Sequence, residues 1–87
     1  MRRRVVLHGR VQGVFFRDSL RRLAEQHGVS GWARNTPEGD VEAVFEGEPH
    51  DVERLVSFAR KGPPDARVEA VDVHEEEPER LSGFAIR

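Results

Sequence analysis

Residues 3–28, RRVVLHGRVQGVFFRDSLRRLAEQHG, contain the pattern that most strongly indicates the fold. Val5 and Leu7 alternate with other residues and predict a strand over residues 3–8. Residues 9–15 hold two glycines and predict a loop. The next residues predict a helix, and Gly28 fits its C-terminal stop. The residues at helical spacing are Phe16, Leu20, Leu23, Ala24 and His27. The stretch is therefore a strand, a glycine loop and a helix.

The remaining chain continues in short units. Residues 29–35 and 41–46 are extended runs, and turn-forming residues 36–40 between them predict a hairpin. Pro49 suits the start of a second helix, which Gly62 and two prolines terminate. Residues 67–74 predict another strand, with a slip of the apolar phase between Ala70 and Val71 that a bulge would cause. Phe84 and Ile86 share one side of a last short strand.

This order, β-α-β-β-α-β with a divided final strand region, is the ferredoxin-like split βαβ plan of an α+β protein. We expect an antiparallel sheet covered on one face by two helices. A chain of 87 residues lacks the apolar surface for a second core, so we expect residues 1–87 to form one domain. The plan hosts enzymes, RNA binders and ligand sensors, so the fold alone does not predict the function.

Composition limits the possible functions. The chain has no cysteine and no apolar run long enough for a membrane span or a signal peptide, so we expect a cytoplasmic protein without a membrane partner. We also expect a monomer. Net charge is −2, which argues against general nucleic-acid binding. Residues 1–34 nevertheless hold eight arginines against two acidic residues, which favours a small anionic partner there.

Residues 9–17, GRVQGVFFR, carry the pattern of an anion site. No Ser, Thr, Asp or Asn stands where the helix cap is expected, so the first helical N–H groups lack a side-chain acceptor. These groups and the helix dipole attract anions, and the two glycines allow the loop to turn further amides inward. Arg17 falls on the first helical turn, where its planar fork can bind two phosphate oxygens. The alternative is an ordinary strand-to-helix turn.

Other polar residues carry weaker signals. Asn35, the only asparagine, ends the second strand, and its alternative role is a turn residue. Trp32 fits sheet packing better than a ligand platform. The histidines, which have no metal-ligand spacing, are His8, His27, His50 and His74. The serines lack His–acid partners for a nucleophile. We therefore expect no metal and no cofactor.

Three segments together resemble the acylphosphatase family in order and spacing: GRVQGVFFR (9–17), GWARN (31–35) and GDVEA (39–43). The end of the chain, GFAIR (83–87), is also similar to the family's end. The resemblance implies hydrolysis of acyl phosphates on a ferredoxin-like fold. It implies that Arg17 is the catalytic arginine and that Asn35 positions the attacking water. The amides implied to bind the phosphoryl oxygens are those of Val11, Gln12, Gly13, Val14 and Phe15.

The implied chemistry is physically consistent. The leaving group is a carboxylate, stable as an anion near neutrality, so no general acid is needed, and phosphoryl transfer depends on positioning and charge stabilisation. Inorganic phosphate or sulfate should compete with the acyl phosphate substrate. Two other functions stay open at this point: a non-catalytic phosphate sensor and an RNA-binding module. An RNA-binding module stacks bases on sheet aromatics, but residues 41–46 are acidic and contain one aromatic.

Overall fold

The computed structural model describes all 87 residues, and its helix boundaries follow the predicted stop and start signals. The first helix ends at His27 and is capped by Gly28, which adopts a left-handed conformation (φ 67°) and donates its N–H to the Ala24 carbonyl. The second begins at Pro49. The elements are β1 (Arg2–Arg10), α1 (Phe16–His27), β2 (Ser30–Asn35), β3 (Val41–Glu46), α2 (Pro49–Lys61), β4 (Arg67–Glu76) and β5 (Phe84–Ile86).

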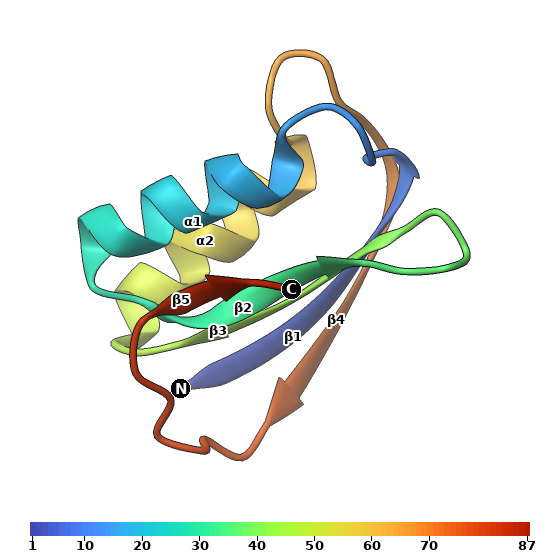
Figure 1. The fold of residues 1–87 in the computed structure, drawn as a ribbon. Coiled ribbons are helices and arrows are strands. Elements are labelled where there is room, and N and C mark those ends of the chain that lie inside the picture. Colours follow the sequence, from blue (N-terminus) through green and yellow to red (C-terminus); the bar gives the residue numbers. More distant parts are fainter.

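The strands form one sheet in the order β4-β1-β3-β2-β5, with both helices on one face (Figure 1). β1 lies between β4 and β3 and pairs antiparallel with both, and β3 pairs antiparallel with β2. The ferredoxin-like plan is confirmed. One pairing differs from the expected antiparallel sheet, because β5 pairs parallel with β2. The chain crosses one end of the sheet after β4 and joins the opposite edge in the direction of β2 (Figure 1, red).

A bulge on β4 shapes the end of β1 where the first loop begins. His8 pairs with Ala70 and Gly9 pairs with Val68, so Glu69 has no partner in the register. The irregularity therefore lies one residue before the predicted slip between Ala70 and Val71. Gly9 has φ 120°, and a Cβ at this position would collide with the carbonyl oxygen of Arg67. Only glycine fits where β4 passes so close to the chain.

The core lies between the sheet and the helices, and it also holds the loop before α1. Strands contribute Val5, Leu7, Val41, Ala43 and Phe45; helices contribute Phe16, Leu20, Ala24, Val52, Leu55, Val56 and Ala59. The Phe45 and Phe84 rings stack with centroids 6.1 Å apart, which fastens β5 to the core. Val11 and Val14 are 1% and 5% exposed, so two apolar side chains anchor the loop from below.

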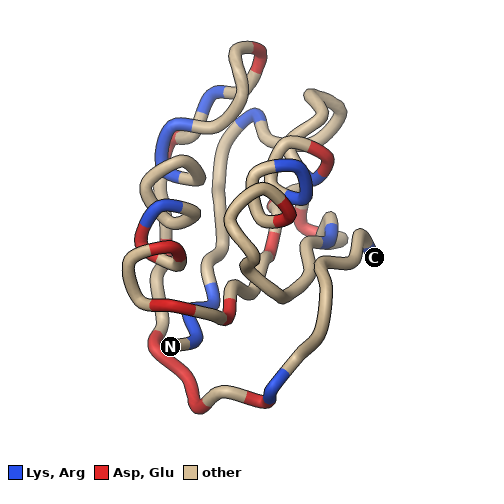
Figure 2. Tube along the Cα trace, turned by 90° about the vertical axis from the view of Figure 1, so that its left-hand side faces the viewer, with Lys and Arg blue, Asp and Glu red and all other residues tan.

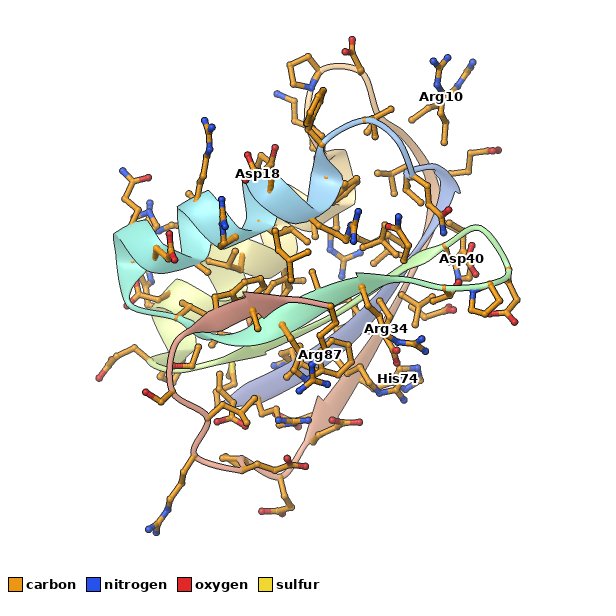
Figure 3. All side chains as sticks on the ribbon, viewed as in Figure 1. Arg10, Asp18, Arg34, Asp40, His74 and Arg87 are labelled. Carbon is orange, nitrogen blue, oxygen red and sulfur yellow. The ribbon has the colours of Figure 1, made fainter.

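Most arginines of the basic first third are engaged in ion pairs. Six of the eight arginines in residues 1–34 form ion pairs, namely Arg2, Arg3, Arg4, Arg21, Arg22 and Arg34. Figure 2 shows the acidic end of β4 beside the arginine-rich start of β1. Only Arg10 and Arg17 of this group have no Asp or Glu partner. Arg10 extends away from the sheet and the helices (Figure 3), whereas Arg17 stands on the first turn of α1.

The most buried of these pairs joins Arg2 to Glu46 on the sheet face opposite the helices. The guanidinium and carboxylate lie 2.7 Å apart, and Glu46 also accepts the main-chain N–H groups of Glu79 and Leu81. Burial by itself raises the pKa of Glu46, but the hydrogen bonds from Glu79, Arg2 and Leu81 outweigh it and lower the pKa. These bonds hold the segment between β4 and β5 across the end of the sheet.

Neither helix is both long and apolar enough to cross a membrane.

Candidate active site

The loop before α1 carries a series of unpaired main-chain donors. The N–H groups of Val11 to Phe15 donate to no carbonyl or side chain of the protein. The first helical amides follow directly, and a helix start leaves such amides without intrahelical acceptors. Unpaired donors of this kind bind a ligand or water. The loop therefore presents a set of amides to the outside of the core.

The start of α1 has no capping side chain, as predicted. The N-cap residue is Phe15, which adopts φ 62° and ψ 27° and makes no side-chain cap bond. Gly13 is also left-handed, with φ 73°. Left-handed residues alternating with ordinary ones turn successive N–H groups toward one point and form an anion-binding nest. The positive end of the helix dipole points at the same place.

Gln12 fastens this loop to the hairpin between β2 and β3. Its side-chain amide donates to the carbonyl oxygens of Thr36 at 2.9 Å and Asp40 at 2.8 Å. The side chain is therefore engaged with the hairpin, and only the main-chain N–H of Gln12 remains for an anion. With Val11 and Val14 buried beneath it, the loop is held at both the hairpin and the core.

Arg17 stands on the first turn of α1 with most of its donors free. One terminal nitrogen donates to the main-chain oxygen of Arg87 at 3.2 Å, and no Asp or Glu side chain pairs with its charge. The neighbouring Asp18 is bound to Arg21 at 2.7 Å and to Arg22 at 3.0 Å, on the side of α1 away from the sheet (Figure 3). The one acidic side chain nearby is thus neutralised by other arginines.

Asn35 reaches the same region from the sheet. Side chains of β2 alternate between faces, and Gly31 and Ala33 are buried on the helix side. Asn35 continues that series at the end of the strand, opposite Val41. Its side-chain amide makes no hydrogen bond within the protein, so it is free to bind a ligand or a water molecule.

These residues surround one hollow of about 300 Å³. The lining residues are Val11, Gly13, Phe15, Phe16, Arg17, Asp18, Asn35 and Ile86. The fold thus brings together Arg17, Asn35 and three of the five predicted loop residues. Gln12 and Val14 do not line the hollow, because their side chains face the hairpin and the core. A larger groove of about 760 Å³ between α1 and α2 contains none of the unpaired loop amides.

Ile86 and Arg87 reach the site through a contact that the sequence pattern did not reveal. The alternation of Phe84 and Ile86 indicated which side of the last strand is apolar. Nothing in that pattern indicated that β5 would pair with β2 and set Ile86 opposite Ala33.

No group of three or more His, Cys, Asp or Glu side chains in the structure could hold a metal ion.

His8 links the hairpin to β4 on the opposite sheet face. Its Nε2 lies 2.8 Å from Asp72 and its Nδ1 lies 3.0 Å from Asp40, the residue whose carbonyl accepts the Gln12 side chain. The hydrogen bond to Asp72, with that to Asp40, outweighs desolvation and raises the pKa of His8 above its ordinary 6.5. Both contacts require both ring nitrogens to carry a hydrogen, which only the imidazolium provides.

We expect His8 to stabilise the fold in a pH-dependent manner. Because its pKa is raised in the folded state, the contribution is full below the ordinary value of 6.5 and is lost as pH rises through the folded value. The melting temperatures of wild type and His8→Gln, measured at about pH 5.5 and about pH 9, test this around the range where histidine titrates. The gap between the two proteins should be wider at the lower pH. An equal gap at both values would show that the charge of His8 does not matter.

Comparisons with known proteins agree on one family. A family model described as acylphosphatase matches residues 3–86. The chain is 60% identical to an acylphosphatase of Rubrobacter xylanophilus, over 97% of this chain and 77% of that protein. It is 56% identical to one of Thermococcus kodakarensis, over 92% of this chain and 88% of that protein. The solved structure of a Coxiella burnetii acylphosphatase superposes with a TM-score of 0.93 at 41% identity, covering 99% of this chain and 90% of that one.

Proposed function

We propose that the hollow between the loop, α1 and β2 is the active site of this protein. The chain belongs to the acylphosphatase family and is therefore a hydrolase of acyl phosphates. One observation carries the proposal. Three of the loop residues with unpaired amides border this hollow together with Arg17, which has no Asp or Glu partner, and Asn35, whose amide makes no hydrogen bond, although they come from three separate elements. A phosphoryl group needs donors of these kinds.

In the proposed mechanism the amides of Val11 to Phe15 and the guanidinium of Arg17 bind the phosphoryl oxygens. They stabilise the charge that these oxygens carry in the transition state. Asn35 orients a water molecule in line with the acyl oxygen. The bond from phosphorus to that water forms as the bond to the acyl oxygen breaks, and the electron pair leaves on the carboxylate. The proton of the water passes to a phosphate oxygen.

The hydrolysis requires no metal ion in this proposal, since Arg17 supplies a positive charge and the loop amides supply hydrogen-bond donors. We expect turnover of acetyl phosphate to persist in excess chelator. The measurement is release of inorganic phosphate with and without the chelator. Loss of turnover on chelation, restored by adding a divalent cation, would overturn this mechanism.

An anion should stabilise the folded protein, because the unfolded chain scatters the donors that the loop collects. Phosphate at a hundredfold excess over Kd contributes about 2.7 kcal/mol. In a domain of this size that raises the melting temperature by about 10 °C or more. Saturable stabilisation is expected in wild type and in Arg34→Ala, and a much smaller shift in Arg17→Ala. Phosphate and sulfate also stabilise proteins by exclusion from the surface, so equal shifts in all three proteins would mean that no site around Arg17 exists.

The two competing functions receive less support. An RNA-binding sheet displays aromatic side chains, whereas the open face here carries ion pairs such as Arg4–Glu42 and Arg34–Glu42. Trp32 on β2 is covered by the Arg87 guanidinium, 4.6 Å from the ring centroid. A sensor that binds phosphate without hydrolysis is not favoured by the family, whose members are named for the hydrolysis.

We further propose that residues 1–87 form one domain, which acts as a monomer in the cytoplasm without a nucleic-acid partner. A single cluster of 17 buried residues supports one domain. Only two large apolar side chains are exposed, too few for the apolar patch of a stable self-association surface. The absence of cysteine fits a reducing compartment.

A further inference from the structure

The two large hydrophobic side chains that are exposed in this protein lie at one place. Phe15 and Ile86 are the two large hydrophobic side chains that remain exposed, at 78% and 39%. They come from opposite ends of the chain, yet both line the hollow that holds Arg17 and Asn35. Apolar groups left at the mouth of a concave site indicate contact with a ligand rather than with the core.

Phe15 has a backbone conformation that is unusual for an aromatic residue. Its φ of 62° lies in the left-handed region, which glycine adopts freely and a bulky side chain disfavours. Strain of this kind persists where the surroundings impose it, and it gathers at functional sites. Phe15 packs into no core, because most of its surface is exposed, so packing does not explain the residue.

Ile86 is held in place independently of the loop. The main-chain N–H of Arg87 donates to the Ala33 carbonyl at 2.8 Å, and β5 pairs Ile86 with Ala33. Arg17 donates to the main-chain oxygen of the next residue, Arg87. The position of Ile86 relative to the phosphate-binding donors is thus set by main-chain bonds.

The hollow therefore has two chemically different parts. The loop amides, Arg17 and Asn35 provide hydrogen-bond donors. The side chains of Phe15 and Ile86 provide apolar surface, and the one carboxylate at the rim, Asp18, is already neutralised by Arg21 and Arg22. A substrate with a phosphoryl group at one end meets apolar side chains at its other end.

We propose that Phe15 and Ile86 bind the acyl group and select acyl phosphates with an aromatic or branched aliphatic acyl group over acetyl phosphate. This inference rests on the proposed function of the hollow. Apolar contacts of this size change selectivity by about tenfold. These contacts involve the acyl end of the substrate, and the donors that bind the phosphoryl group stay the same.

The test is the ratio of kcat/KM for benzoyl phosphate to that for acetyl phosphate. Phe15→Gly and Ile86→Ala should each lower the wild-type ratio by about tenfold, as expected for losing apolar contact with one substrate only. Phe15→Leu, which keeps an apolar side chain, should retain most of the wild-type ratio. A disturbed loop would affect both substrates alike, so the ratio isolates contact with the acyl group. Phe15→Gly should not lower the melting temperature, because glycine adopts this backbone without strain.

Phe58→Ala serves as the matched control. It removes an aromatic side chain from the groove between α1 and α2, so it should lower the melting temperature but leave the ratio unchanged. An unchanged ratio in Phe15→Gly and Ile86→Ala, with both substrates still requiring Arg17, would overturn the acyl-binding rim alone. If both substrates were hydrolysed without Arg17, the proposed function of the hollow would fail instead.

Discussion

Arg17→Lys should lower kcat/KM for acyl phosphate hydrolysis by about two to three orders of magnitude, the usual cost of removing one well-placed transition-state donor. Lysine keeps the charge but replaces a planar fork with a single ammonium, which cannot bind two phosphoryl oxygens side by side. The melting temperature should change little, since Arg17 is partly exposed and makes one hydrogen bond, to the Arg87 main-chain oxygen.

Arg34→Lys is the matched control for this variant. Arg34 lies on the opposite face of the sheet and pairs with Glu42 at 2.6 Å (Figure 3). The same chemical change there should leave turnover close to wild type. The assignment of Arg17 would be wrong if Arg17→Lys kept most of its turnover or if both variants lost it equally.

Asn35→Ala should lower kcat about a hundredfold, because misplacing a reacting group by about an ångström has an effect of that order. The affinity for inorganic phosphate should stay near the wild-type value, since the loop amides and Arg17 remain. A loss of kcat without loss of phosphate binding is the pattern of an interaction made with the attacking water.

Steady-state kinetics and phosphate titration on the same preparation measure the two quantities. Arg34→Ala, one residue earlier on β2, controls for disturbance of the strand and should leave both quantities unchanged. If phosphate affinity in Asn35→Ala fell as far as kcat, Asn35 would belong to the phosphate-binding donors. That result would leave the position of the water to another group.

The order of elements could be predicted from the sequence because each element has a local signal. The spacing from Phe16 to His27 predicted α1, Gly28 predicted its end, and Pro49 predicted the start of α2. The absence of a capping residue before Phe16 predicted unpaired amides there. These features depend on residues within a few positions of one another, so a linear pattern is sufficient to reveal them.

Some details of the sheet could not be predicted from such local patterns. The alternation in residues 67–74 indicated an irregularity near Ala70, but its position depends on how β4 passes Gly9 of β1. A strand's period shows which side chains share a face, but not which strand lies beside it. The parallel pairing of β5 with β2 was therefore absent from the prediction.

A strand, a glycine-containing loop and an uncapped helix with Arg17 on its first turn follow from the sequence, because these are local properties of the chain. That Asn35, Ile86 and the main-chain oxygen of Arg87 meet this region follows only from the three-dimensional packing. The packing also pairs six other arginines of residues 1–34 with carboxylates, whereas Arg17 pairs with no Asp or Glu side chain. These contacts join residues that are far apart in the sequence, so they form only when the strands pair and the helices pack on the sheet.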